Sequence, residues 1–290
     1  MRNLPWLRVV PGEPSTRKRD RLSFDSRARL ELDETRIRPP LERLAKALVS
    51  GYSDLLAPIR TVRTTVDSLP VPPPEDPLIM VGEWLDEALR EACQRHPNAM
   101  TLATVDTASR PSARVVLIKE LARIEGYATF YGHYQSRKGL ELESNANAAG
   151  VLHWDKLGRQ IRFEGLVVRA PEEESDAYFA TRPKGSQLNA WVSEQSRPLE
   201  NLEELARRAR EKAHDLGVAE EQDDGAAPQN GVPVPRPPFW GGYRFWFAAV
   251  ELWLEGEDRF HGRLRYERAL TPKGAYAFAT GPWACQRLQP

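Results

Sequence analysis

The chain has 290 residues, which is long enough for one large domain or two small ones with a substantial hydrophobic core. Its 41 lysines and arginines balance 41 aspartates and glutamates, so the net charge gives no general attraction to nucleic acid or membranes. No apolar run approaches the roughly 20 residues of a membrane span, and the short apolar stretch 7–10 ends at Pro11, unlike a signal peptide. Cys93 and Cys285 show no metal or redox spacing. Together these features predict a cytoplasmic protein without a nucleic-acid or membrane partner.

The first 75 residues differ in composition from the rest, and we interpret residues 1–75 as a partly disordered N-terminal extension. Apolar residues at helical spacing predict one helix over 41–59. The prolines within 70–74 predict a stiff linker. The basic cluster 17–19 could bind an acidic partner, but a solvated tail is the simpler interpretation.

From residue 76 onward the pattern is that of a globular domain, which begins with an amphipathic helix over 77–94. The expected apolar stripe of this helix is Ile79, Val81, Trp84, Leu85 and Leu89. Further helices are expected over 171–182 and 199–216, and a mobile loop over 217–238.

Short apolar runs separated by turn residues predict several strands in the same region. The expected strands are 100–105, 114–119, 127–131, 150–154, 160–168, 243–254, 259–266 and a short last one between Trp283 and Leu288. These strands alternate mainly with turns rather than with helices, which argues against a doubly wound sheet. We therefore predict a mainly β (α+β) fold, an antiparallel barrel with peripheral helices.

The strands 114–119 and 127–131 are expected to form a hairpin with unusually placed cations. Its pairing would bring Arg114 near Ser136, Arg137 and Lys138. Strand alternation would send Arg114 and Lys119, five residues apart, to opposite faces, so that the hairpin serves two separate anions. An edge hairpin with solvated basic ends is an equally open interpretation.

Four polar side chains alternate along the expected strand 259–266, so Arg259, His261, Arg263 and Arg265 would share one face. Guanidinium groups in a row repel one another unless carboxylates or a bound anion neutralise them. The alternative is an exposed face with solvent counterions. His261 is the only histidine that we expect to be functional.

Two further groups suggest ligand contacts. Tyr178 and Arg182 lie one helical turn apart, and with Ser186 beyond Pro183 they could clamp a phosphate. The alternative for this group is a core-edge tyrosine beside a surface arginine. Gln195 and Ser196 could, together with Trp253, hold a planar ring that forms hydrogen bonds, and no metal-ligand spacing, dinucleotide fingerprint or P-loop is present.

Taken in order, these motifs resemble the pyridoxamine 5'-phosphate oxidase family of FMN-dependent enzymes. The matching segments are 114–119, 131–138, 159–160, 178–191, 195–196, 239–242, 251–253 and 259–263. The resemblance covers roughly residues 76–290, with a C-terminal dimerisation and substrate segment at about 240–290. Each motif is weak alone, but the ordered set is specific.

The resemblance implies a split antiparallel β-barrel that forms a homodimer with FMN at the subunit interface. It implies oxidation of pyridoxine or pyridoxamine 5'-phosphate to pyridoxal 5'-phosphate, with O2 as the acceptor and hydrogen peroxide as a product. The implied FMN-binding residues are Arg114, Val115, Val116, Leu117, Ile118, Lys119, Tyr131, Gly132, Ser136, Arg137, Lys138, Gln160, Gln195, Ser196, Trp253 and Arg263. The implied substrate-binding residues are Lys119, Tyr178, Arg182, Ser186, Arg259 and His261, of which the last two flank the pyridine ring and are the implied catalytic residues.

Several residues depart from the family pattern. Gly132 stands where threonine is frequent, Gly262 replaces a typical aspartate, and Arg265 adds a charge. Residues 217–232 and 271–281 look like insertions. The alternatives to the implied function are a related flavin oxidase acting on a phenazine-type substrate and a non-catalytic FMN-binding module.

Overall fold

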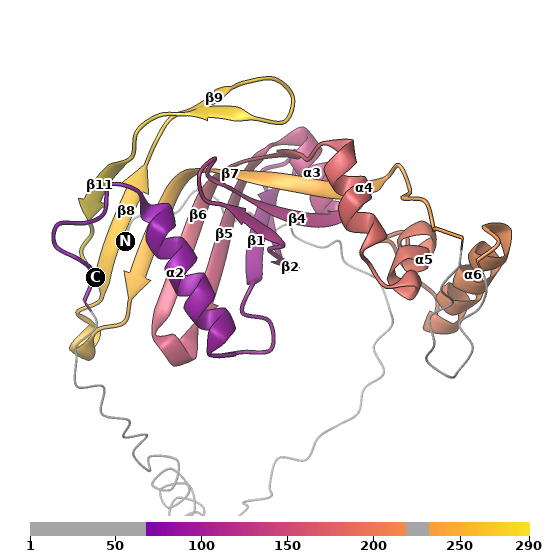
Figure 1. The fold of residues 1–290 in the computed structure, drawn as a ribbon, viewed down its shortest axis with the longest axis horizontal. Coiled ribbons are helices and arrows are strands. Elements are labelled where there is room, and N and C mark those ends of the chain that lie inside the picture. Colours follow the sequence, from indigo (N-terminus) through magenta and orange to yellow (C-terminus); the bar gives the residue numbers. More distant parts are fainter. Residues whose placement is uncertain (1–67, 219–231) are drawn as a thin grey trace, which may run out of the picture. The chain divides into compact units, whose positions relative to one another are not determined.

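The computed structural model of the chain describes residues 68–218 and 232–290 (Figure 1). The helix expected over 41–59, the basic cluster 17–19 and most of the loop expected over 217–238 lie outside these residues. The compact unit that contains the described residues begins at Thr65, before the boundary at residue 75 expected from the sequence. No helix in the described ranges combines the length and the apolar character needed to cross a membrane.

The centre of the fold is a nine-stranded antiparallel sheet with the strand order β11-β8-β7-β6-β5-β1-β2, to which β4 and β3 are joined through β7. The strands are β1 (Ala99–Val105), β2 (Pro111–Leu117), β3 (Glu120–Ala122), β4 (Tyr127–His133), β5 (Asn147–Trp154), β6 (Arg159–Arg169), β7 (Trp240–Leu254), β8 (Gly262–Glu267) and β11 (Ala284–Arg287). A separate two-stranded hairpin comprises β9 (Leu270–Pro272) and β10 (Phe278–Thr280). Burial alternates clearly along β1 and along the first part of β6. The mainly β, antiparallel split-barrel fold predicted from the sequence is confirmed, and the sheet curls into a half-barrel.

The long strand β7 changes partners along its length. Its first half pairs with β4, from Trp240 opposite His133 to Trp246 opposite Tyr127. Its second half pairs with β8, while β6 runs beside it on the other edge throughout. One strand that serves three neighbours in this way makes the sheet curl into a half-barrel (Figure 1).

A bulge between Glu164 and Gly165 of β6 accommodates this curl, because the register with β7 shifts there. A glycine is required at position 165 because the backbone of β7 lies very close to it, and not because of its own backbone angles. A Cβ atom at this position would lie 1.9 Å from the carbonyl oxygen of Trp246. The neighbouring strand can therefore reach Gly165 only while it has no side chain.

Helix α2 (Pro77–Arg90) packs its apolar side into the same core as the strands (Figure 1). Its Asp76 cap accepts a hydrogen bond from the Leu78 amide at 2.9 Å. The helix ends at Arg90, earlier than the predicted end at residue 94. The predicted apolar stripe is only partly right, because Ile79 and Leu89 are 55% and 49% exposed.

The predicted hairpin of residues 114–119 with 127–131 is wrong. The strand β2 pairs with β1, so Arg114 lies opposite Leu102. The chain then breaks at Ile118, and the short strand β3 forms the hairpin with β4 instead. Each strand has the predicted β character, but alternation of side chains does not specify which partner a strand takes.

The predicted common face of Arg259, His261, Arg263 and Arg265 is also wrong. Strand β8 begins at Gly262, and Arg259 lies in the preceding 3-10 turn, η2 (Glu257–Arg259). Only Arg263 and Arg265 share a strand face. Their charges are neutralised by carboxylates, since Arg263 binds Glu251 at 2.8 Å and Arg265 binds Glu164 at 2.9 Å.

Four other helices complete the described chain: α3 (Arg137–Ser144), α4 (Glu172–Ala180), α5 (Lys184–Val192) and α6 (Leu202–Asp215). The sequence predicted α4 and α6 but not α3 or α5. Helix α3 is short, and Ser136 caps it by accepting a hydrogen bond from the Gly139 amide at 3.3 Å. This cap directs the N-terminus of α3 toward the cavity described below.

We expect Gly165→Ala to destabilise the protein by about 1–3 kcal/mol, because the new methyl group would collide with the β7 backbone. Denaturant unfolding of the purified variant measures this loss. Gly185→Ala is the matched control, since nothing lies within 4 Å of a Cβ atom there and the change sits in helix α5. The control should be neutral or slightly stabilising, by up to about 1 kcal/mol. Equal stability of the two variants would contradict the close-approach role of Gly165.

Candidate functional site

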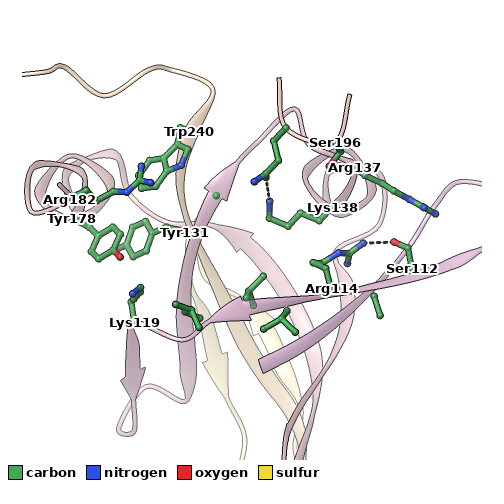
Figure 2. Close-up of a pocket in the computed structure, with 16 residues that line it drawn as sticks. Ser112, Arg114, Lys119, Tyr131, Arg137, Lys138, Tyr178, Arg182, Ser196 and Trp240 are labelled. Carbon is green, nitrogen blue, oxygen red and sulfur yellow. Dashed lines mark hydrogen bonds between the residues drawn. The ribbon is translucent and has the colours of Figure 1, made fainter. Parts of the chain in front are cut away.

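A cavity of about 680 Å³ opens between the edge strand β2, strand β4 and the helices α3 and α4 (Figure 2). Its volume lies in the range of small-molecule and cofactor sites. The residues that line it are Ser112, Ala113, Arg114, Val115, Val116, Leu117, Lys119, Tyr131, Gly132, Arg137, Lys138, Tyr178, Arg182, Gln195, Ser196 and Trp240. Most of the residues expected to bind a ligand are thus gathered in one place from four separate stretches of the chain.

The cavity has one polar end, formed by β2 and the N-terminus of α3 (Figure 2). Arg114 projects from β2 and donates hydrogen bonds to the Leu102 carbonyl at 3.1 Å and to the Thr104 hydroxyl at 2.6 Å. Arg137 and Lys138 follow the Ser136 cap of the helix. Three cations therefore meet at the positive end of a helix dipole, which favours an anion.

A buried carboxylate orients these cations. Glu141 is 4% exposed and accepts hydrogen bonds from Thr104, from Ser112 at 2.6 Å, and from both Arg114 at 3.2 Å and Arg137 at 2.8 Å. Burial alone raises the pKa of the Glu141 carboxyl, but these hydrogen bonds and the charge of Arg114 outweigh it and lower the pKa to about 2. Glu141 is thus ionised at neutral pH and connects α3 to β1 and β2.

Lys138 is buried, and no carboxylate within the described ranges pairs with it. Its ammonium group donates to Ser136 Oγ at 2.9 Å and to Gln195 Oε1 at 2.7 Å. Desolvation and then the nearby charge of Arg114 lower the pKa of Lys138 to about 8. Gly132 makes room for this side chain, because a Cβ atom there would lie 2.8 Å from Lys138 Cε and Nζ.

The other end of the cavity is aromatic and carries separate cations (Figure 2). The rings of Tyr131 and Tyr178 stack with centroids 3.8 Å apart, and the Trp240 ring lies 5.8 Å from Tyr131. The Arg182 guanidinium lies 4.5 Å from the centroid of Trp240, and its buried Nη1 has no hydrogen-bond partner among the described residues. Lys119 Nζ lies 5.8 Å from the Tyr178 ring.

The prediction that Arg114 and Lys119 serve separate pockets is wrong, because both line this one cavity. Strand alternation does not extend from one to the other, since β2 ends at Leu117 and the chain bends before β3. Figure 2 shows Arg114 and Lys119 toward opposite ends of the cavity. Two anionic groups could therefore still be bound, but within one continuous site.

A second group of the expected ligand residues does not line the cavity. Gln160 lies opposite Trp253, and Trp253 lies opposite Arg263, across neighbouring strands. The His261 ring is 4.7 Å from the Trp253 ring, and Arg259 is exposed in the adjoining turn. Trp253 is near the end of the 15-residue strand β7, whereas the cavity is at its start, on the order of 40 Å away along the strand.

Three more of the expected residues lie beside the cavity without lining it. Ile118 is in the hydrophobic core, Ser136 caps α3, and Ser186 is in the first turn of α5. The sequence analysis missed the cavity residues Ser112, Ala113 and Trp240. Ser112 could have been found two residues before Arg114, on the same face of the strand. Trp240 lies within the matching segment 239–242, but only the tertiary fold brings it to the cavity.

The fold and cavity define the class: a split-barrel protein of mainly antiparallel sheet with a cation-rich ligand cavity beside an edge strand. Two family models match the chain, namely "Pyridoxamine 5'-phosphate oxidase" over residues 85–213 and "Pyridoxine 5'-phosphate oxidase C-terminal dimerisation region" over residues 240–290. The chain belongs to the pyridoxamine 5'-phosphate oxidase family of oxidoreductases.

Named relatives support this membership. A pyridoxine/pyridoxamine 5'-phosphate oxidase of Rubrobacter xylanophilus is 46% identical over 74% of this chain and 87% of its own length. One from Burkholderia mallei is 44% identical over 81% of this chain and 99% of its own. The match to the dimerisation model indicates that the C-terminal strands belong to a region used for self-association in the family.

Two solved structures resemble the fold. One is PhzG from Burkholderia lata in complex with tetrahydrophenazine-1-carboxylic acid, with a TM-score of 0.61, 32% identity, and coverage of 75% of this chain and 94% of that one. The other is a pyridoxamine 5'-phosphate oxidase-related, FMN-binding protein from Nostoc punctiforme, with a TM-score of 0.52 and 13% identity over 72% of this chain and 96% of that one. The second likeness concerns the fold alone.

In Glu141→Gln, the free energy of unfolding should depend less on pH in the acid range than it does in the wild type. Because the pKa of Glu141 is lowered from 4.5 to about 2, the unfolded chain binds more protons between these values. The carboxylate therefore contributes stability above pH 4.5 that is lost as the pH falls toward 2, on the order of 2 kcal/mol. Denaturant unfolding at pH 3, 4, 5 and 7 measures the difference between the variant and the wild type. A difference independent of pH would contradict the ionised, hydrogen-bonded state of Glu141.

Proposed function

We propose that this protein is an FMN-dependent oxidase that converts pyridoxine or pyridoxamine 5'-phosphate to pyridoxal 5'-phosphate, with O2 as the acceptor and hydrogen peroxide as a product. The observation that carries this proposal is the pair of unneutralised cationic groups at the two ends of one cavity. Lys138 lies at one end and Arg182 at the other, and neither has a carboxylate partner within the described residues. A phosphorylated cofactor and a phosphorylated substrate together would supply both missing charges.

The polar end fits the phosphate of FMN. A buried ammonium without a counterion is costly, and a phosphate placed at the N-terminus of α3 would neutralise it. Arg114 and Arg137 are already oriented by Glu141, so binding requires little reordering of their side chains. Gly132 and the edge strand β2 leave the backbone accessible to the rest of the cofactor.

The aromatic end fits the phosphate of the substrate. Arg182 is held between the rings of Phe179 and Trp240, with its centre 5.7 and 4.5 Å from their centroids, and its Nη1 is left without a partner in the described chain. Lys119 and the Tyr178 hydroxyl lie at the same end of the cavity. A phosphate held there would place the substrate's pyridine ring deeper in the cavity, toward the cofactor.

We further propose that the functional unit is a homodimer. Gln160, Trp253 and Arg263 lie far along β7 from the cavity of their own chain, together with Arg259 and His261. In a dimer formed through residues 240–290, this second group would complete the cavity of the partner copy. FMN, when bound, would supply the redox chemistry, in which the hydride leaves C4' of the substrate and O2 takes up the electrons. The chain's own residues hold the phosphates, and Arg259 and His261 orient the ring.

The purified protein tests the proposal directly. A visible spectrum shows whether it carries flavin, and addition of pyridoxine 5'-phosphate under air should yield aldehyde and hydrogen peroxide in equal amounts. Unphosphorylated pyridoxine is the control and should react far more slowly, since it leaves Arg182 unpaired. A yellow protein without turnover would contradict the oxidase activity and leave the fold untouched. Turnover of a phenazine-type precursor instead would favour the activity suggested by the PhzG likeness.

Arg182→Ala should mainly raise KM for the phosphorylated substrate, by about a hundredfold if one charge-assisted interaction worth up to about 3 kcal/mol is lost. Arg259→Ala should also lower kcat, because this side chain acts on the reacting ring rather than on the phosphate. Steady-state kinetics with saturating FMN separates the two effects. An unchanged KM in Arg182→Ala would show that the phosphate assignment is wrong.

FMN affinity should fall as the pH rises past 8. In the free protein the pKa of Lys138 is lowered to about 8, so the ammonium that faces the phosphate is lost above this value. The loss between pH 7 and pH 9 should approach tenfold, measured by quenching of flavin fluorescence. Lys138→Met should bind FMN more weakly at pH 7 and show a flatter profile. Parallel profiles for the two proteins would contradict the role of Lys138.

A further inference from the structure

We infer that Leu69 is a positioning residue for the turn that carries Arg259 and His261, and that Gly262 creates the space in which Leu69 fits. This inference rests on the proposed function, since it assumes that these two side chains contact the substrate. Leu69 is distant from them in sequence, and no motif marks it. Leu69 packs directly against Gly262.

Leu69 is 4% exposed and belongs to the main hydrophobic core together with Leu254 and Leu264. A Cβ atom built on Gly262 would lie 3.2 Å from Leu69 Cδ1 and 3.3 Å from Leu69 Cγ. Both distances are shorter than an ordinary van der Waals contact, so Leu69 would have to shift by a few tenths of an ångström to admit a Cβ atom. The side chain of Leu69 therefore occupies the space that a side chain at position 262 would need.

The segment around Leu69 is also fixed from the other side. Arg287, in the last strand β11, donates a hydrogen bond from Nη2 to the Pro70 carbonyl oxygen at 2.7 Å. Strand β11 pairs with β8, whose first residue is Gly262. The segment that carries Leu69 is thus joined by a hydrogen bond to the same pair of strands against which Leu69 packs.

The turn that precedes Gly262 is strained, and the Phe260 amide closes it by donating to the Glu257 carbonyl at 2.9 Å. Asp258 and Arg259 both have positive φ angles, 49° and 67°, in the left-handed region that costs energy for residues other than glycine. Phe260 is 79% exposed, so it contributes little packing. The His261 ring accepts one hydrogen bond at Nδ1, from the Gly256 amide at 3.2 Å, and contacts the Trp253 ring, while the His261 amide donates to the Arg259 carbonyl at 2.8 Å.

These observations give Leu69 its role. A strained turn persists only when its surroundings determine its conformation, and Leu69 packs against the residue at which this turn joins β8. Removing the leucine side chain leaves a cavity next to Gly262, into which the start of β8 can relax. Arg259 and His261 would then shift together, since both lie within three residues of Gly262.

Leu69→Ala tests the inference in the FMN-loaded dimer, with Leu85→Ala as the matched control. Both leucines are buried in the same core. Leu85, however, is in helix α2, and none of the atoms nearest Gly262 belongs to it. We expect kcat/KM to fall about tenfold or more in Leu69→Ala, through kcat as well as KM. Leu85→Ala should lose thermal stability to a similar extent and keep its turnover. Leu85→Ala should also keep its FMN affinity.

Three further variants keep the test informative if Leu69→Ala folds poorly. Gly262→Ala should reduce turnover because its methyl group displaces Leu69, and the double variant Leu69→Ala/Gly262→Ala should recover part of that loss. Leu69→Met, which conserves the side-chain volume, should remain close to the wild type. If the loss of turnover in the double variant equals the product of the losses in Leu69→Ala and Gly262→Ala, the inference is overturned.

Failure of the inference can be distinguished from failure of the proposed function. If Arg259→Ala and His261→Ala leave turnover unchanged, the substrate role of the turn is wrong. If both reduce turnover but Leu69→Ala behaves like Leu85→Ala, the proposed function stands and the positioning role of Leu69 is wrong. In Leu69→Ala, a further Arg259→Ala should cost less than it costs in the wild type, because the two residues act through one turn.

Discussion

The fold depends on one long strand, β7, that forms backbone hydrogen bonds with three neighbouring strands. It pairs with β4 over its first half and with β8 over its second, while β6 follows it throughout with a register shift at Gly165. This arrangement curls the sheet, and it also fixes two sets of polar residues at opposite ends of one strand. Trp240 begins β7 in the wall of the cavity, and Trp253 lies near its end beside Arg263 and His261. Within a single chain these two sets are kept apart by the length of the strand, which is why the proposed active site requires a second copy.

The cations of the fold are of two kinds: those paired with carboxylates, which are structural, and those without such a partner, which are available to a ligand. Arg265 binds Glu164, and Arg263 binds the buried Glu251, so their charges are neutralised inside the sheet. Lys138 is buried and Arg182 is half-buried with its Nη1 out of contact with water, yet among the described residues they have only neutral or aromatic partners. An unpaired buried charge is unfavourable unless a ligand supplies its partner. The difference therefore favours anion binding at the cavity. Along β8, carboxylates neutralise the arginines, which is one of the alternatives that the sequence had left open.

Much of the fold was predictable because alternating apolar residues mark strands and turn residues mark their ends. Strand β2 shows the limit of this signal: its β character was predicted, but its pairing with β1 rather than β4 depends on contacts distant in sequence. The cavity residues within motifs, such as Arg114 and Tyr178, were predictable from charge and spacing. Glu141 was not, because a carboxylate in a charged helix resembles a solvent-exposed residue until the fold buries it beneath Arg114.

The two glycines that depart from the family pattern have a common physical explanation. Gly132 leaves the space that the end of the Lys138 side chain occupies, and Gly262 leaves the space that Leu69 occupies. In each case a neighbouring side chain lies where a side chain at the glycine position would be. At Gly132 the neighbour is itself a cation of the proposed phosphate site. At Gly262 it is an apolar residue that supports the turn of Arg259 and His261. The departures thus change how the proposed ligand-binding groups are held, while the charges that the cavity presents remain those expected for two phosphorylated ligands.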